Sequence, residues 1–114
     1  MCRPTTLATA GLLLWTCAAA AGPDPARGQR LVAQYHCGRC HSVPGVPGAG
    51  GRVAVTLAGI GARSYIAGRV PNDDLRLERF LVAPDSVVPG STMPALGVTP
   101  ADARDIAAYL RGLR

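Results

Sequence analysis

The chain has few of the large side chains from which a small domain builds a core. Its 114 residues include one Trp, one Phe and three Tyr, whereas Gly and Pro are frequent, with 14 and 10 copies. This length allows one small domain, and small domains bury a low fraction of their surface. Such a domain usually needs a disulfide, a metal or a bulky bound group for stability. We therefore expect one of these three to complete the core.

The first 21 residues have the pattern of a secretory signal peptide. Arg3 is the only charge there, a short apolar run covers 7–15, and the alanines that follow form an A-x-A cleavage site. We predict cleavage after Ala20 or Ala21, which leaves residues 22–114 as the mature domain. The alternative is a retained membrane anchor, although the apolar run is shorter than a bilayer-spanning helix needs.

Processing decides which residues remain for chemistry. Cleavage removes Cys2 and Cys17, which excludes a two-disulfide framework, and it leaves Met93 as the single methionine. A lipid anchor on Cys17 is disfavoured because Thr16 stands where a small residue is expected. All 12 basic residues are Arg, so lysine chemistry is excluded, and losing Arg3 lowers the formal net charge of +5 to about +4.

Three helices joined by long loops are predicted, with no strand pattern. The helix starts are capped by Asp24, by Asn72 or Asp73, and by Thr99 followed by Pro100. The apolar faces are Gly28, Leu31, Val32 and Tyr35 in the first helix, Leu75, Leu77, Phe80 and Leu81 in the second, and Ala103, Ile106, Ala107 and Leu110 in the last. Residues 44–51 and 87–98 are rich in Gly and Pro and predict irregular loops, and residues 57–65 predict a short helical turn.

Cys37, Cys40 and His41 form a C-x-x-C-H motif, the attachment signature of c-type haem. On a helical turn the two thiols face the same side and can bind the two vinyl groups of one porphyrin as thioethers. His41 projects toward the same ring and offers an imidazole nitrogen to the iron. A thioredoxin-like pair would need a βαβ unit, which the pattern lacks, and a zinc site would need a ligand beyond His36. The motif predicts one covalently bound haem c.

The sixth position on the iron has one candidate ligand. His36 adjoins an attachment cysteine and cannot reach the opposite side of the ring. Met93 is the only thioether of the mature domain, and it lies in a Pro/Gly-rich loop far enough along the chain from His41 to wrap a porphyrin. Ligation by His and Met raises the potential of electron-transfer cytochromes. We predict Met93 as the ligand; the alternative is a methionine that only packs in the core.

These segments together resemble the class I cytochrome c family over nearly the whole mature domain. The matching segments are 28–31, 37–41, 57–60, 89–94 and 102–113. The C-x-x-C-H motif is highly specific, and the Pro-Gly-x-x-Met pattern ending at Met93 is moderately so. The resemblance implies a small all-α fold of three to four helices, with long loops wrapped around one haem c.

The resemblance also implies how the helices and the histidine are held. In this family the first and last helices cross closely, which Gly28 would allow, with Tyr109 or Leu110 packed against it. The histidine ligand of the family donates its other ring N–H to a loop carbonyl, often that of a proline. Val55 stands at this position here, so the carbonyl is retained but the rigidity of the proline is not.

Two residues resemble those that contact the haem propionates in the family. Arg63 takes the place of an arginine near a propionate, and Tyr65 is a second candidate for such a contact. The alternative for each is a solvated surface side chain. For Ser91 and Thr92 the pattern does not choose between a propionate bond and a role in shaping the turn.

An iron with both axial positions filled has no open site for a substrate, so we expect one-electron transfer and no enzyme activity. The resemblance implies a periplasmic electron carrier. Its donor would be a quinol–cytochrome c reductase or a periplasmic dehydrogenase, and its acceptor a terminal oxidase or reductase. The positive charge favours acidic partner surfaces. Nucleic-acid binding is not expected, because the Arg residues are scattered and the chain is exported.

We expect a monomer with no membrane span after processing, and two alternatives stay open. One is a haem subunit of a larger redox complex, which would co-purify with its partner. The other is a haem sensor or small peroxidase in which Met93 dissociates to admit a ligand. The second alternative has no distal His and no Arg at a recognisable spacing to support it.

Overall fold

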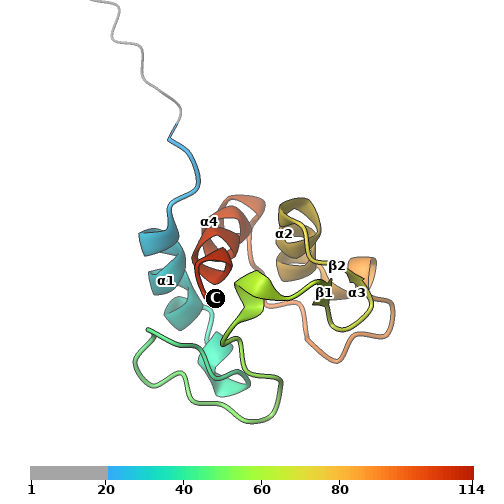
Figure 1. Ribbon diagram of the computed structural model, residues 1–114, viewed down its shortest axis with the longest axis horizontal. Helices are drawn as coiled ribbons and strands as arrows, with labels where there is room; N and C mark the ends of the chain where they lie inside the picture. The colour runs from blue at the N-terminus through green and yellow to red at the C-terminus, as the bar shows by residue number, and fades with distance from the viewer. Residues whose placement is uncertain (1–20) are drawn as a thin grey trace, which may run out of the picture.

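The computed structural model describes residues 21–114, so the predicted signal segment lies almost entirely outside the described residues. Within this part of the chain the α-helices are α1 (Pro25–Gln34), α2 (Asp74–Val82), α3 (Pro84–Val87) and α4 (Pro100–Arg111) (Figure 1). The shorter elements are the 3₁₀ turns η1 (Cys37–Arg39) and η2 (Ile60–Ala62) and the strands β1 (Tyr65–Ile66) and β2 (Val70–Pro71). This composition confirms the all-α class. None of the described helices combines the length and the apolar character that crossing a membrane requires.

The three predicted helices begin at the caps that the sequence indicates. Asp24, Asp73 and Thr99 precede α1, α2 and α4. In each case the side-chain oxygen accepts a hydrogen bond from the backbone N–H three residues further on, at 3.0, 2.8 and 3.2 Å. These bonds satisfy N–H groups that have no partner inside the helix. Asp73, and not Asn72, is the cap of α2.

Helices α1 and α4 cross at Gly28, as the resemblance implies. A Cβ atom at Gly28 would lie 1.9 Å from the carbonyl oxygen of Asp105, so no larger residue fits without moving backbone. The three atoms nearest to such a Cβ all belong to the backbone of Asp105 and Ile106. The packing of Tyr109 or Leu110 against this glycine stays a prediction.

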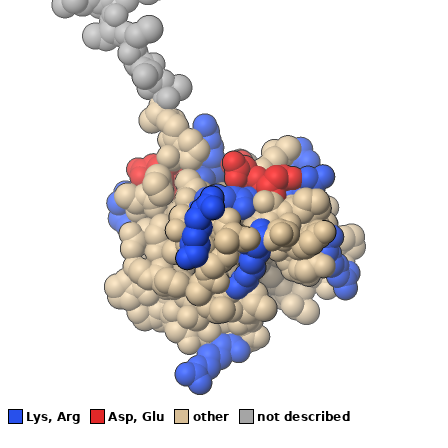
Figure 2. Space-filling view, viewed as in Figure 1, with Lys and Arg blue, Asp and Glu red and all other residues tan. Residues whose placement is uncertain are grey.

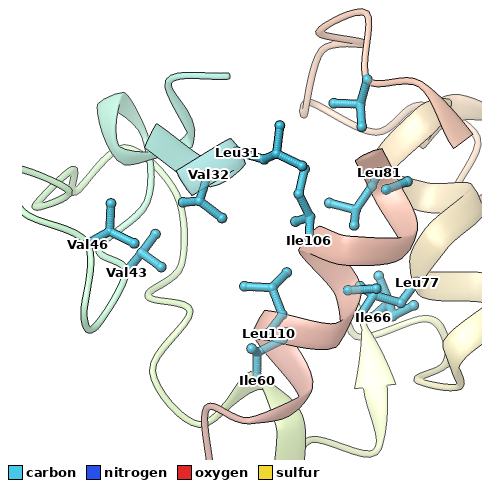
Figure 3. Close-up of a cluster of buried hydrophobic side chains, with 13 residues drawn as sticks. Leu31, Val32, Val43, Val46, Ile60, Ile66, Leu77, Leu81, Ile106 and Leu110 are labelled. Atoms are coloured by element: carbon cyan, nitrogen blue, oxygen red, sulfur yellow. The ribbon is translucent and has the colours of Figure 1, made fainter. Parts of the chain in front are cut away.

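The buried apolar side chains form one core around α4. Figure 3 shows Val32, Val43 and Val46 on one side of this helix and Leu77 and Leu81 on the other. The predicted face of α4 is buried in full, comprising Ala103, Ile106, Ala107 and Leu110. This core consists almost entirely of aliphatic side chains of modest size. The aromatic side chains of Tyr35, Phe80 and Tyr109 pack against it and are only partly buried.

Three local features differ from the predictions. The hairpin of β1 and β2 was not expected, because strands of two residues are too short to show alternation; Ala67 and Gly68 form its turn with φ of 50° and 66°. Helix α3 was also not expected. Pro84 predicts the end of the preceding helix, but in the structure it is the first residue of a new one. Leu75 was expected on the apolar face of α2, but 57% of its surface is exposed.

Candidate functional site

The C-x-x-C-H motif folds as one tight turn directly after α1. His36 adopts a left-handed conformation with φ of 57°, which separates α1 from the 3₁₀ turn η1 that follows. The backbone N–H groups of Cys40 and His41 both donate to the carbonyl of Cys37, at 3.2 and 3.0 Å. Both thiols are free and partly buried, and burial raises the pKa of the Cys37 thiol. The turn therefore presents two free thiols next to one imidazole.

Glycine is required where the following loop returns over this turn. The N–H of Gly51 donates to the carbonyls of Gly38 and His41, at 3.0 and 3.2 Å. A Cβ at Gly51 would lie 2.6 Å from the carbonyl carbon of Cys40, and one at Gly38 would lie 2.5 Å from the Cα of Ala49. The loop thus packs against the motif backbone with no room for side chains. No pattern in the sequence predicted this role of the two glycines.

His41 is held by the loop carbonyl that the family resemblance implies. Its Nδ1–H donates to the carbonyl oxygen of Val55 at 2.6 Å. Because a carbonyl can only accept, this bond places a proton on Nδ1, so Nε2 is the ring nitrogen that could bind a metal. The imidazole is partly buried, in keeping with a ring that has one covered edge and one accessible nitrogen.

Met93 lies in the loop between α3 and α4. Its side chain is partly buried and packs against the same core that Cys37 contacts. Its backbone N–H donates to Oγ of Ser91 at 3.3 Å, so Ser91 shapes the turn that presents the methionine. The Met93 loop and the segment after η1 both lie at the end of the helices away from the start of α1 (Figure 1). The coordination of iron by Met93 stays a prediction.

Arg63 and Tyr65 have different surroundings. Nη2 of Arg63 donates to the carbonyl oxygens of Thr56 and Ala58, at 2.6 and 3.0 Å. Tyr65 lies in β1 opposite Pro71, and 57% of its surface is exposed. The bonds of Arg63 were not expected, and they tie it to the loop that holds His41. A propionate contact stays a prediction for both residues.

A polar cluster that the sequence analysis missed joins α1 to α4 beside the motif. Arg27 forms ion pairs with Asp102 at 2.5 Å and with Asp105 at 2.7 Å, and the hydroxyl of Tyr35 donates to Asp102 at 2.6 Å. The backbone N–H of Asp24 donates to Asp105 at 2.8 Å. The only signal was that Asp102 and Asp105 lie three residues apart and so share a helix face.

These hydrogen bonds shift the acidity of the cluster. The bond from the Tyr35 hydroxyl, followed by that from Arg27, holds the pKa of Asp102 below its usual range. The backbone N–H of Asp24, followed by Arg27, does the same for the pKa of Asp105. The bond to Asp102 raises the pKa of the Tyr35 hydroxyl. The cluster is therefore charged and paired at neutral pH, and it fixes the helix that leads into Cys37.

The donor set fits a covalently bound haem. Two free thiols and an imidazole with an available Nε2 are the groups that this attachment requires. The apolar side chains of Leu57, Phe80 and Val82 are partly buried and pack against the core, so each keeps some exposed apolar surface.

The other uses of the motif find less support. Residues 21–114 contain no group of three or more His, Cys, Asp or Glu side chains that could hold a metal ion, so the zinc alternative has no ligand set there. The sheet of the described part of the chain is a two-stranded antiparallel hairpin, so it contains no βαβ unit of the thioredoxin kind.

Charge is unevenly distributed around this site. No Asp or Glu occurs between Asp24 and Asp73, a stretch that includes the whole motif and its loop. On the face shown in Figure 2, red side chains lie only along the upper edge, whereas blue side chains extend to the lower end. Arg39 and Arg52 are both exposed. The segment that carries the two thiols thus has no acidic side chain of its own, and the nearby carboxylates of Asp102 and Asp105 are paired with Arg27.

Comparisons with known proteins agree with this site. The family model described as Cytochrome c matches residues 25–114. The chain is 31% identical over 109 residues to cytochrome c2 of Rhodomicrobium vannielii, which covers 86% of each protein. It is 33% identical over 89 residues to cytochrome c oxidase subunit 2 of Alkalihalophilus pseudofirmus, which covers 77% of this chain but 25% of that protein. The chain therefore spans about a quarter of the length of the oxidase subunit.

Proposed function

The chain belongs to the cytochrome c family, whose members carry a covalently bound haem c, and from this premise we propose that it is a periplasmic carrier of single electrons. The family supports a haem electron carrier in general. The proposal adds the periplasmic location, the binding of iron by His41 and Met93, and the exchange of electrons with redox protein partners. Its strongest support is the 2.6 Å hydrogen bond between Nδ1 of His41 and the carbonyl of Val55 inside a C-x-x-C-H motif.

Each residue of the site has a proposed role. Cys37 and Cys40 hold the haem through thioether bonds, which prevents its loss outside the cytoplasm. His41 donates its Nδ1–H to Val55 and uses Nε2 as an axial ligand, and the hydrogen bond makes the imidazole a stronger donor. Met93 would be the second ligand to the iron, from the loop between α3 and α4. Bound haem supplies an iron that changes its charge by one electron, with a potential that these ligands set.

Covalent attachment is tested by replacing both cysteines. In the haem-loaded protein we expect acidified acetone to leave the haem bound to the wild type and to strip it from the C37A/C40A variant. M93A is the matched control, because it alters iron ligation and leaves both thioethers in place. Haem that stayed bound to C37A/C40A would contradict the proposed attachment.

Export is tested on the chain as the cell produces it. The proposal predicts a periplasmic protein whose first residue, by mass spectrometry, is Ala21 or Gly22. A full-length chain recovered with the membrane fraction would support the retained anchor instead. The location of the protein therefore distinguishes a cleaved signal peptide from a retained membrane anchor.

The charge around the motif is proposed to guide negatively charged partners. Arg39 and Arg52 are exposed beside the attachment turn, in a stretch without acidic residues. Oxidation of the reduced protein by hexacyanoferrate(III), a small anion, should slow with added salt and by about tenfold in the R39Q/R52Q variant at low ionic strength. R79Q/R104Q, which removes two exposed charges from α2 and α4, is the control with the same charge change. A rate that is independent of salt and of R39Q/R52Q would refute this role.

One observation favours a second candidate function. Similarity to a quarter of a cytochrome c oxidase subunit 2 shows that related domains occur within larger proteins. This chain would then serve as the fixed haem subunit of one redox complex. A free carrier should elute as a monomer on gel filtration, whereas a fixed subunit should co-purify with its partner in constant proportion.

A further inference from the structure

The loop that holds His41 is tied to the motif on either side of the accepting carbonyl. The N–H of Ala54 donates to the carbonyl of Cys40 at 2.9 Å, and that of Leu57 donates to the carbonyl of Ser42 at 2.8 Å. Between these two bonds Val55 exposes 66% of its surface, and it lacks the ring through which a proline would restrict the backbone. The carbonyls of Val55 and Thr56 are therefore open to further bonds from elsewhere in the chain.

Arg63 supplies such bonds. Its Nη2 donates to the carbonyl oxygens of Thr56 and Ala58, at 2.6 and 3.0 Å. The Thr56 carbonyl belongs to the peptide unit next to the one whose oxygen His41 uses. Because neighbouring peptide planes share a Cα atom, holding one limits the rotation of the other. Arg63 thus restricts the only acceptor that the structure gives to Nδ1 of His41.

The segment that carries Arg63 is itself held by hydrogen bonds and close packing. Nδ2 of Asn72 donates to the carbonyls of Ile60 and Arg63, both at 2.9 Å, and the N–H of Gly61 donates to Leu113 at 2.8 Å. A Cβ at Gly61 would lie 2.2 Å from the carbonyl oxygen of Arg111, so η2 is packed directly on the end of α4. The guanidinium therefore connects the loop to the segment that packs on the end of α4.

We propose that Arg63 is the positioning residue for His41, and that it replaces the restriction a proline would impose at position 55. This inference rests on the proposed function, because it assigns to His41 the role of axial ligand. Arg63 acts on the imidazole through the Thr56 and Val55 peptides. Its effect on the iron is therefore separate from that of its positive charge.

The two effects of Arg63 have opposite signs in the reduction potential. Holding the Val55 carbonyl on Nδ1–H makes the imidazole a stronger donor, which favours the oxidised iron and lowers the potential. A positive charge near the haem disfavours the oxidised iron and raises the potential. Lysine keeps the charge, but its ammonium is a strongly hydrated point charge on a flexible stem and lacks the planar Nη2 group that donates to both carbonyls. The R63K variant consequently isolates positioning from charge.

The experiment uses haem-loaded wild type, R63K, R63Q and, as a control, R69Q on the exposed β1–β2 turn. A c-type α band on reduction is checked first, and its absence from the wild type would count against the proposed function. NMR of the reduced protein then gives the exchange rate of the His41 Nδ1–H, with the Ile106 amide as the reference for global opening. If one of the two Arg63 variants fails to fold, the exchange rate is measured on the other.

We expect the Nδ1–H to exchange at least about tenfold faster in both Arg63 variants, equivalent to about 1.4 kcal/mol, with Ile106 unchanged. The potential of R63K should rise, and R69Q should leave the exchange rate at the wild-type value. The inference is overturned if Nδ1–H exchange is unchanged, or if it accelerates only in step with Ile106. It is also overturned if R63K keeps the wild-type potential while that of R63Q falls.

Discussion

Replacing Gly28 with Ala tests the crossing of α1 and α4, which carries the attachment motif into place. The new Cβ would lie 1.9 Å from the carbonyl oxygen of Asp105, whereas ordinary contact begins at 3.4 Å. The helices would have to part by about 1.5 Å, the difference between these distances. Because the obstructing atoms are backbone, no rotamer change relieves the clash, and the ion pairs from Arg27 to Asp102 and Asp105 would lengthen.

The magnitude follows from two opposing terms. Overpacking costs about 3 kcal/mol at the upper end of its usual range, which applies when backbone must move. Alanine stabilises a helix relative to glycine by about 1 kcal/mol. The net loss in the free energy of unfolding is about 2 kcal/mol, and a domain of this size should melt about 8–16 °C lower.

Thermal unfolding of the haem-loaded G28A variant, followed by circular dichroism, measures this loss. Gly50 is the matched control, since a Cβ there meets no atom within 4 Å and its φ is not positive. G50A should stay within about 0.5 kcal/mol of the wild type. The reasoning is refuted if G28A melts at or above the temperature of G50A.

Three further outcomes are expected. The M93A variant should have a lower potential, and its ferrous haem should bind carbon monoxide; an unchanged potential without binding would exclude Met93 as a ligand. The G51A variant should yield several-fold less covalently bound haem than G50A, because its Cβ would lie 2.6 Å from the carbonyl carbon of Cys40; equal yields would contradict the tight loop. The lowered pKa values of Asp102 and Asp105 mean that their contribution to stability is complete above about pH 4 and is lost as pH falls through the folded-state values. A D102N/D105N variant should therefore lose less melting temperature than the wild type between pH 5 and pH 3, and parallel losses would show that these carboxylates are not the cause.

Local sequence signals were sufficient for much of the fold. The caps at Asp24, Asp73 and Thr99 were predictable because each bond joins residues three apart in the chain. The buried face of α4 followed from its spacing. Helix α3 was missed because Pro84 both ends one helix and begins another, and a rule based on proline alone cannot separate these roles.

The site was predictable where one short motif specifies it. Cys37, Cys40 and His41 lie within five residues, and their chemistry requires this spacing. The cluster around Arg27 was not predictable, because its bonds join residues that are 75 and 78 positions apart in the chain. The bonds of Arg63 reach only seven and five residues back, but they lie in irregular backbone, where no periodicity indicates which carbonyl a side chain meets.

The visible spectrum of the protein, exported together with a cytochrome c maturation system, tests the central claim most directly. The spectrum is recorded first for the oxidised protein and then for the reduced protein. We predict a sharp c-type α band on reduction and a weak far-red methionine–iron band when oxidised. An α band without the far-red band would contradict ligation by Met93 and favour an open iron. A protein without haem absorbance would contradict the account as a whole.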